Sequence, residues 1–255
     1  MSDKYTRAAL ETIFNVFSRL GYGIVVFRRN EGAEYVRCLP NDYSTYCGWR
    51  QPRFQELYAK VKGKTACTQD RLYMIHEFAR SCRNLKGDFA ECGVYKGGSA
   101  YLIASVLANT HEEVELHLFD TFSGFPGMDY YPAGHKKGDF GDTSLESVKS
   151  YLSDFPLVTY HQGLIPSTLE TAKERMFSFV HVDVDLYEPA RDCCEFFYSR
   201  MVKNGMMLFD DYGIQCFEES IRRAVDEFFR DKAERPIALR TGQCLVIKER
   251  LTERV

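Results

Sequence analysis

The sequence lacks any apolar run long enough to cross a membrane and any block of like charges. It has 255 residues, of which 33 are basic and 36 acidic, and a formal net charge of -3. A membrane-spanning helix needs roughly 20 consecutive apolar residues, and nucleic-acid-binding domains usually carry a basic patch. Residues 1–7 also lack the apolar segment of a signal peptide. We therefore expect no membrane and no nucleic acid among the partners.

Cysteine pairs with metal-binding or redox spacing are also missing. The nine cysteines are odd in number, none lies in a Cys-x-x-Cys pair, and only Cys193 and Cys194 are adjacent. Disulfides persist mainly in oxidising compartments, and scattered free cysteines usually pack as small apolar residues. We therefore expect reduced, mostly buried thiols in a cytoplasmic protein, with Cys193 and Cys194 packing inside a helix.

From about residue 65 the sequence alternates regularly between short apolar runs and amphipathic segments. The expected strands are 88–93, 115–120, 157–162, 178–183 and 206–210, and the expected helices are 69–84, 98–109, 144–153, 188–201 and 216–230. Two further strands, 236–240 and 243–248, would form a C-terminal antiparallel hairpin. This alternation predicts an α/β fold with a doubly wound, mostly parallel sheet. In the last helix the expected apolar stripe is Phe217, Ile221, Val225 and Phe228.

Two segments break this rhythm. Residues 1–64 contain one helix-like pattern within 1–30 and an apolar stretch at 23–27, and then become irregular. We expect an N-terminal helical and irregular extension, 1–64, ahead of one domain, 65–255. Residues 121–143 are rich in glycine, aspartate and aromatics. Loops of this length in compact domains often act as lids. The insert's aromatics (Phe122, Phe125, Tyr130, Tyr131 and Phe140) are also compatible with plain loop anchors.

Two pairs of aspartates follow two apolar runs. Asp183 and Asp185 end the run that begins at Phe179, and Asp210 and Asp211 end the run from Met206. In open α/β sheets, ligands bind beyond the carboxyl ends of the strands. Four carboxylates converging there would repel one another without a cation between them. With no nearby cysteine expected, oxygen ligation favours a hard ion such as Mg²⁺.

A glycine-rich turn follows the strand expected at 88–93. Its spacing, Glu91-x-Gly93-x-x-x-Gly97-Gly98, matches neither the dinucleotide fingerprint nor a P-loop. An acidic residue before the glycines suits a cationic ligand, such as the amino group of S-adenosylmethionine (SAM), better than a pyrophosphate. Asp120 ends the next strand, where a carboxylate can accept ribose hydroxyls. The alternative is a tight turn in which Ser99 caps the next helix.

Four ordered motifs resemble the macrocin O-methyltransferase family, which comprises bacterial enzymes that methylate sugar hydroxyls of antibiotics with SAM and Mg²⁺. The motifs are residues 90–99, 118–126, 181–189 and 209–212. The resemblance covers residues 65–248. It implies a Rossmann-like SAM methyltransferase fold with a seven-stranded sheet. It also implies transfer of a methyl group to a hydroxyl of a sugar or polyol on a small-molecule natural product.

The same resemblance implies roles for individual residues. Asp183, Asp210 and Asp211 would bind Mg²⁺, and Asp185 would be the catalytic base. The residues expected at SAM are Glu91, Gly93, Tyr95, Gly97, Ser99, Asp120, Thr121 and Phe122. The acceptor would carry vicinal hydroxyls, and the N-terminal segment and residues 121–143 would help to enclose it. Related enzymes often self-associate, so a homo-oligomer is expected.

Other interpretations remain open on the residues alone. Asp183-Val184-Asp185 is also the Asp-x-Asp signature of metal-dependent nucleotide-sugar glycosyltransferases. A non-catalytic SAM-binding protein on the same fold is a third class. His181, inside an apolar run, is favoured as a satisfied core histidine over a catalytic one, and its place on the same strand face as Asp183 is compatible with support for that residue. His135, next to two lysines in the insert, is expected to be solvated.

Overall fold

The computed structural model describes residues 47–108, 114–127 and 134–249. Contacts divide the chain into residues 1–46 and residues 47–255, so every described residue belongs to the second unit. The helix and the apolar stretch expected within residues 1–30 lie outside the described residues. The roles proposed for the N-terminal extension, 1–64, stay predictions.

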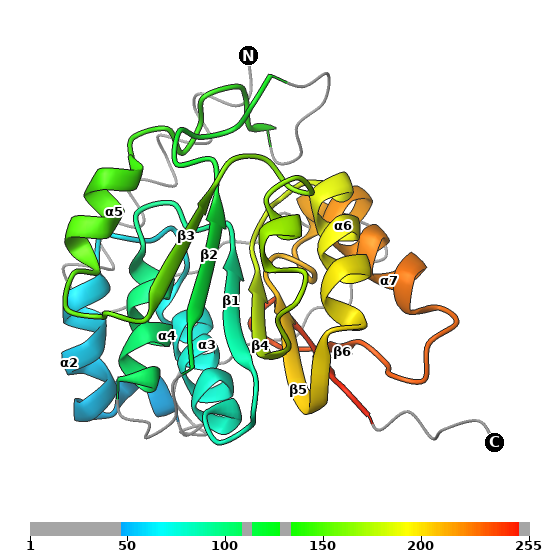
Figure 1. Cartoon of the computed structure of the whole chain (residues 1–255), viewed down its shortest axis with the longest axis horizontal. Coiled ribbons are helices and arrows are strands. Elements are labelled where there is room, and N and C mark those ends of the chain that lie inside the picture. Colours follow the sequence, from blue (N-terminus) through cyan, green and yellow to red (C-terminus); the bar gives the residue numbers. More distant parts are fainter. Residues whose placement is uncertain (1–46, 109–113, 128–133, 250–255) are drawn as a thin grey trace, which may run out of the picture. The chain divides into compact units, whose positions relative to one another are not determined.

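Seven strands form one sheet in the order β3-β2-β1-β4-β5-β7-β6 (Figure 1). The strands are β1 (Asp88–Cys92), β2 (Leu116–Asp120), β3 (Val158–Gln162), β4 (Phe177–Val182), β5 (Met201–Phe209), β6 (Ile237–Ala238) and β7 (Cys244–Ile247). Strands β1 to β5 are parallel to one another, whereas β7 is antiparallel to both β5 and β6. The predicted mostly parallel seven-stranded sheet with a C-terminal antiparallel hairpin is confirmed.

Strand β1 lies at the point where the chain reverses its direction across the sheet. It pairs with β2 on one side and with β4 on the other. The chain first moves outward through β2 and β3, and then returns to the far side of β1. Such a reversal opens a crevice at the carboxyl ends of the two strands, where open α/β sheets bind their ligands.

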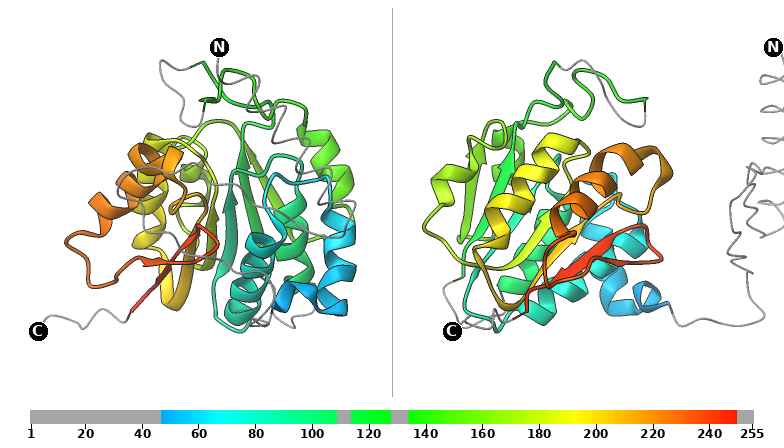
Figure 2. Two further views of the ribbon diagram at one scale, coloured as in Figure 1. Left: turned by 180° about the vertical axis from the view of Figure 1, so that it is seen from behind. Right: turned by 90° about the vertical axis from the view of Figure 1, so that its right-hand side faces the viewer.

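Helices cover both faces of the sheet (Figures 1 and 2). The helical elements are η1 (Gly48–Arg50), α2 (Pro52–Val61), α3 (Gln69–Cys82), α4 (Gly98–Leu107), α5 (Leu145–Tyr151), η3 (Leu169–Ala172), α6 (Tyr187–Tyr198), η4 (Gln215–Phe217), η5 (Glu218–Arg222) and α7 (Arg223–Phe229). Helices α3 and α4 contact each other, as do α6 and α7. Among the described helices, none is both long enough and apolar enough to cross a bilayer.

Two buried apolar clusters lie on opposite sides of the sheet. Phe89 and Phe179 belong to the cluster that contains residues of α3 and α4. Their chain neighbours Ala90 and Val180 belong to the cluster with residues of α6 and α7. Side chains alternate between the two faces of a strand. The central strands are therefore buried on both faces, which explains their nearly continuous apolar sequence.

Strand β5 differs from its prediction at its start. It begins at Met201, not at residue 206, and its register against β4 shifts between Phe177 and Phe179. Asn204 has a positive φ of 64°, and Gly205 follows it. An Asn-Gly pair in a polar stretch is typical of a turn. The Asn-Gly pair therefore predicted a turn at a position where β5 continues as an irregular strand.

The helix expected at 216–230 is three short elements. A 3₁₀ turn, η4, leads into a π-helical turn, η5, and then into α7. A π turn contains more residues than an α turn, so the apolar stripe advances. Phe229 is buried at the end of the stripe, whereas the expected Phe228 is only partly buried.

Candidate active site

A cavity of about 640 Å³ lies at the carboxyl edge of the sheet. Its walls come from the segments that follow β1, β2, β4 and β5, from the connection before α3, and from the insert after β2. The lining residues include Cys67, Arg71, Gly93, Tyr95, Ser99, Asp120, Thr121, Asp183, Asp185, Asp210 and Asp211. The volume falls in the range of roughly 300–1,000 Å³ that is usual for small-molecule sites.

The glycine-rich turn forms one wall and packs directly against the end of β4. Gly93 has a φ of 88°, and a Cβ placed on it would lie 1.8 Å from the backbone oxygen of Asp183. The Asp183 amide also donates a hydrogen bond to the carbonyl oxygen of Cys92 at 2.8 Å. Any larger residue at position 93 would therefore separate two segments of the site.

The start of α4 corrects one expectation. Ser99 does not cap this helix, because the N-cap is Gly97, which has a φ of 85° and makes no side-chain cap bond. Ser99 lies within the first turn, is buried and lines the cavity. Gly97 itself is not among the lining residues. The left-handed backbone at Gly97 is what lets the turn enter the helix.

Asp120 joins the end of β2 to the glycine-rich turn. Its Oδ2 accepts hydrogen bonds from the backbone amides of Val94 at 2.6 Å and Tyr95 at 3.1 Å. Its Oδ1 accepts one from the amide of Phe122 at 2.6 Å. These bonds fix the direction of the carboxylate. An ionised carboxylate has about four acceptor positions, so a half-exposed Asp120 keeps capacity for a ligand hydroxyl.

Glu91 lies behind the cavity wall. It has no exposed surface, it is absent from the cavity lining, and its Oε1 is 2.8 Å from Nδ1 of His181. The two residues are paired across β1 and β4. Their remaining polar atoms, Glu91 Oε2 and His181 Nε2, have no hydrogen-bond partner in residues 47–108, 114–127 and 134–249. The contact expected between Glu91 and the amino group of SAM stays a prediction.

His181 is a buried core histidine, as its sequence context favoured. Burial lowers its pKa, but the hydrogen bond to Glu91 and the charges of Glu91, Asp210 and Asp183 outweigh burial and raise the pKa to about 9. The raised pKa favours the protonated imidazole, which lies in β4 two residues before Asp183.

The four expected aspartates converge. Carboxylate oxygens of Asp183, Asp185 and Asp211 lie within 4.8 Å of one another, and an oxygen of Asp210 lies equally close to Asp183. Asp185 and Asp211 have positive φ values of 60° and 59°. Non-glycine residues seldom adopt this conformation, which costs free energy and tends to persist at functional sites. The backbone is thus held in a strained form that brings these carboxylates together.

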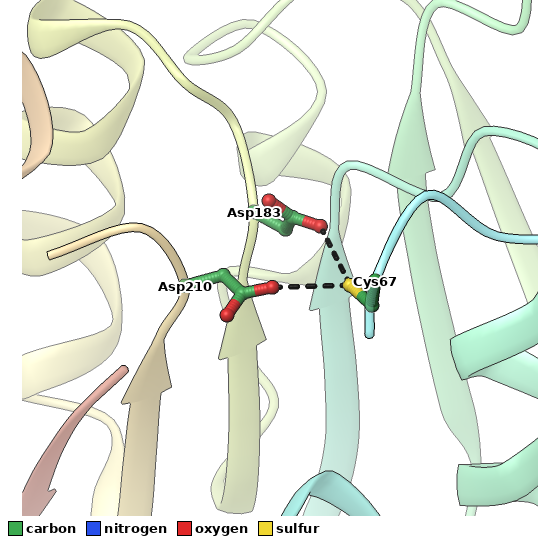
Figure 3. A group of neighbouring side chains, drawn as sticks. All are labelled: Cys67, Asp183 and Asp210. Atoms are coloured by element: carbon green, nitrogen blue, oxygen red, sulfur yellow. Dashed lines mark hydrogen bonds between the residues drawn. The ribbon is translucent and has the colours of Figure 1, made fainter. Parts of the chain in front are cut away.

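Two further side chains at the cluster were missed in the sequence. Nη1 of Arg71 lies 2.6 Å from Oδ1 of Asp211 and 3.2 Å from Oδ2 of Asp210. The thiol of Cys67 donates to Oδ2 of Asp210 at 3.1 Å and lies 3.7 Å from Oδ2 of Asp183 (Figure 3). The premise that no cysteine lies near the acidic residues was therefore wrong.

The connection that carries Cys67 gave no local signal of this position. Residues 62–68 join α2 to α3 and have no apolar strand or glycine-rich motif. Only the docking of α3 beside the carboxyl edge brings its first turns, and the residues before them, to the acidic residues. That placement depends on contacts far apart in the chain, which no local pattern encodes.

The electrostatics of the cluster fit a bound cation. Burial and the negative charges of Asp210, Asp185 and Asp211 raise the pKa of Asp183 well above its usual value. Burial and the neighbouring Asp211 raise the pKa of Asp185 in the same way. Of the four carboxylates, those of Asp210 and Asp211 pair with the Arg71 guanidinium, and Oδ1 of the buried Asp210 has no hydrogen-bond partner within the described part of the chain. A divalent ion would supply the missing positive charge.

The insert supplies apolar and aromatic surface to the cavity. Phe125, Gly127, His135 and Phe140 line it, and the ring centroids of Phe125 and Phe140 are 5.6 Å apart. His135 is half-buried with its ring 5.3 Å from that of Phe140, so the expectation that it is solvated was wrong.

The remaining insert residues do not form one group. Phe122 is 3% exposed and packs in the core, and it is not among the lining residues. Thr121 lines the cavity, and its hydroxyl donates to the carbonyl oxygen of Gly124 at 2.8 Å. Tyr130 and Tyr131 lie outside the described residues.

Known proteins with similar sequences are O-methyltransferases. A family model described as Macrocin-O-methyltransferase (TylF) matches residues 54–239. The chain is 29% identical over 157 residues to demethyldecarbamoylnovobiocin O-methyltransferase of Streptomyces niveus, which covers 57% of this chain and 59% of that protein. It is 27% identical over 147 residues to 8-demethyl-8-(2,3-dimethoxy-alpha-L-rhamnosyl)-tetracenomycin-C 4'-O-methyltransferase of Streptomyces olivaceus, which covers 53% and 56%. The chain thus spans less than two thirds of the length of these relatives.

Solved structures agree on the fold. The O-methyltransferase NovP matches with a TM-score of 0.61 and 27% identity, over 73% of this chain and 84% of that chain. The calicheamicin methyltransferase CalS11 matches with a TM-score of 0.56 and 16% identity, over 77% and 93%. The predicted Rossmann-like SAM methyltransferase fold is therefore confirmed.

Proposed function

Because this chain belongs to the macrocin O-methyltransferase family, we propose that it transfers a methyl group from SAM to a hydroxyl of a sugar or polyol on a small-molecule natural product. The observation that carries the proposal is a single cavity with two chemically different sides. The turn that contains Gly93, together with Asp120, forms one side, and the four aspartates form the other. A methyl donor and a hydroxyl acceptor can meet between these sides.

The acceptor class follows from chemistry and from the relatives. One sequence relative is named for methylation of a rhamnosyl-substituted tetracenomycin, and the other for methylation of a novobiocin derivative. The cavity combines the acidic residues with aromatic surface from Phe125 and Phe140. Sugars present hydroxyls at their edges and apolar C–H faces to such surfaces. We therefore assign a glycosylated small molecule with vicinal hydroxyls as the acceptor.

On the acceptor side, Asp183, Asp210 and Asp211 would hold Mg²⁺, and Asp185 would take the proton of the reacting hydroxyl. A bound Mg²⁺ supplies positive charge that lowers the pKa of an acceptor hydroxyl. Burial and Asp211 raise the pKa of Asp185, and a base with a raised pKa is better matched to a proton transfer near neutral pH. The proton must leave because a neutral alcohol is a poor nucleophile toward a sulfonium.

On the donor side, Asp120 would accept hydrogen bonds from the ribose hydroxyls. Its orientation is set by the amides of Val94, Tyr95 and Phe122, so little reorganisation is needed when SAM binds. Gly93 and Ser99 would flank the methionine part. Residues 121–143 would close over the acceptor and exclude water, a role that the contribution of Phe125, His135 and Phe140 to the cavity lining supports.

The alternatives explain less of the same cavity. An Asp-x-Asp glycosyltransferase would use Asp183 and Asp185 but would give no role to Asp120 or to the glycine-rich turn, and the family match provides no support for it. A non-catalytic SAM-binding protein would not need Asp185 and Asp211 in a strained backbone conformation.

Calorimetric titrations test the proposal directly. The protein is titrated with SAM and with a uridine diphosphate sugar, each with and without Mg²⁺. We expect SAM to bind and the nucleotide sugar not to bind. Incubation with SAM, Mg²⁺ and demethyl-sugar natural products should then yield a product one methyl group heavier by mass spectrometry. Binding of the nucleotide sugar without binding of SAM would overturn the proposal.

A further inference from the structure

Cys67 lies where a thiol is unexpected in a site for a hard ion. Its Sγ is 3.1 Å from Oδ2 of Asp210 and 3.7 Å from Oδ2 of Asp183, and in Figure 3 the sulfur points into the space between the two carboxylates. One donor atom from each of Cys67, Asp183 and Asp210 lies within 4.8 Å of the other two. These atoms come from three segments far apart in the chain, so the grouping is a product of the fold.

A second observation shows that this group is not satisfied by itself. Asp210 is 1% exposed, and its Oδ1 has no hydrogen-bond partner among the described residues. A buried carboxylate oxygen without a partner costs free energy. Asp210 therefore retains unused ligand capacity at Oδ1, while its Oδ2 faces the Cys67 thiol.

The position of Cys67 is fixed by its surroundings. Its amide donates to Oγ1 of Thr65 at 3.0 Å, and the amide of Gly98 donates to the carbonyl oxygen of Lys64 at 2.9 Å. A Cβ at Gly98 would lie 2.7 Å from that Lys64 oxygen, so the segment packs tightly on the start of α4. Ligand groups held by such contacts are preorganised for a metal ion.

We propose that Cys67, Asp183 and Asp210 form a mixed thiolate–carboxylate site that binds a thiophilic divalent cation of the Zn²⁺ class. The inference rests on the proposed function only in placing a cation at the acidic residues. Thiolate ligands favour Zn²⁺ and softer ions, whereas Mg²⁺ binds oxygen ligands. On binding, the Cys67 S–H bond breaks, the sulfur donates its electron pair to the cation, and the proton passes to solvent.

The two kinds of ion would compete. A hard ion would use carboxylates of Asp183, Asp210 and Asp211, and a thiophilic ion would use two of the same carboxylates together with Cys67. Because Asp183 and Asp210 are shared, one ion excludes the other. Cys67 thus decides which metals the site selects, and a thiophilic ion should displace Mg²⁺.

Cd²⁺ is the probe, because a cadmium–thiolate bond gives a charge-transfer band in the ultraviolet. Three proteins are compared: the wild type, Cys67→Ser and the control Cys216→Ser, whose thiol is exposed and does not line the cavity. We expect the band in the wild type and in Cys216→Ser, and its loss in Cys67→Ser. Loss of a metal ligand should weaken Cd²⁺ binding by about tenfold or more, whereas Mg²⁺ affinity should be unchanged.

A labelling experiment on the wild type covers the case in which Cys67→Ser does not fold. Cys67 is alkylated with iodoacetamide in the presence of Cd²⁺ or Mg²⁺, and its peptide is quantified by mass spectrometry. Protection by Cd²⁺ but not by Mg²⁺ is expected. A band of full strength in Cys67→Ser, or equal labelling of Cys67 with and without Cd²⁺, would overturn the inference. If Mg²⁺ still binds in that case, the proposed function survives; if no divalent ion binds, both fail.

Discussion

The two edges of the parallel sheet treat charge in opposite ways. At the amino edge, Asp88 and Glu115 each pair with Arg175, at 3.2 and 2.9 Å, and the amide of Glu115 donates to Asp88 at 3.1 Å. At the carboxyl edge, four aspartates converge, and the guanidinium of Arg71 pairs with two of them, Asp210 and Asp211. The same strands therefore end in a compensated network on one side and in an excess of negative charge on the other.

The pKa values of buried carboxyl groups are shifted in opposite directions at the two edges. Burial raises the pKa of Asp88, but hydrogen bonds from His117 and the Glu115 amide and the charges of His117 and Arg175 lower it more, so its pKa is below its usual value. Burial and like charges raise the pKa of Asp183. Buried charge that is already paired serves the fold, whereas unpaired buried charge requires a ligand. The charged residues at the amino edge therefore stabilise the fold, whereas those at the carboxyl edge are suited to bind a ligand.

The largest expected effect comes from Asp185→Asn. Loss of a general base typically costs about 10²–10⁴-fold in rate, so turnover should fall by that factor. Mg²⁺ affinity, followed by calorimetry, should stay nearly intact, because Asp183, Asp210 and Asp211 would hold the ion. Asp183→Asn is the matched variant and should lose Mg²⁺ affinity. If Asp185→Asn lost Mg²⁺ binding while Asp183→Asn kept it, the two roles would have to be exchanged.

Asp120 sharpens the comparison. It lies at the carboxyl edge, but its carboxylate already accepts hydrogen bonds from the backbone amides of Val94 and Phe122. Loss of a charge-assisted hydrogen bond costs about 1.5–3 kcal/mol, so Asp120→Ala should weaken SAM binding by roughly tenfold or more. Calorimetry measures the affinity, and circular dichroism confirms the fold. Asp154→Ala is the control, because Asp154 is exposed and absent from the cavity lining.

Glu91 tests whether a residue buried behind the cavity wall contributes to SAM binding. Glu91→Gln keeps the shape of the side chain but removes the charge that faces His181. We expect weaker SAM binding, since the earlier expectation places the amino group of SAM at this carboxylate. Unchanged SAM affinity in both Glu91→Gln and Asp120→Ala would contradict the assignment of these two residues to SAM binding.

Arg71→Gln should remove the guanidinium that pairs with Asp210 and Asp211. Hydrogen bonds to charged groups contribute about 1.5–3 kcal/mol, so the metal-free protein should lose stability of that order in chemical denaturation. Added Mg²⁺ should restore more stability in this variant than in the wild type, because the competing guanidinium is absent. Arg80→Gln, on the same helix α3 but pairing with Glu77 at the surface, should change neither quantity. Equal effects in both variants would contradict the role of Arg71.

Much of this edge could be predicted because its signals are local. Asp183, Asp185, Asp210 and Asp211 follow apolar runs, and parallel strands bring such ends together by topology alone. The mostly parallel sheet and the antiparallel hairpin followed from the alternation of apolar runs and amphipathic segments. Asp120 was found because it ends the strand after the glycine-rich turn.

The residues that the sequence did not reveal depend on tertiary contacts. Arg71 and Cys67 lie at the start of α3 and just before it, and their role exists only because that helix docks beside β4 and β5. Arg175 precedes β4 and lies in the chain far from Asp88, its partner at the amino edge. Residues at helix ends and in connections show no periodic apolar pattern from which their tertiary contacts could be predicted.

The pH dependence of stability should differ in sign between the two edges. The folded pKa of Asp88 is lowered, so its contribution is present above its unfolded pKa and is lost as pH falls through the folded value. The folded pKa of Asp183 is raised. Its contribution is present below the unfolded pKa and is lost as pH rises through the folded value.

Chemical denaturation of the metal-free protein from acidic to neutral pH separates the two edges. Asp88→Asn should remove part of the acid sensitivity and flatten the curve at its acidic end. Asp183→Asn should instead raise stability at neutral pH relative to the wild type, since it removes a buried charge surrounded by like charges. One full unit of pKa shift corresponds to about 1.4 kcal/mol of stability. If stability as a function of pH changed in the same direction in both variants, the two edges would not differ. The sign of the change depends only on whether the buried carboxylate is paired with an opposite charge in the folded protein.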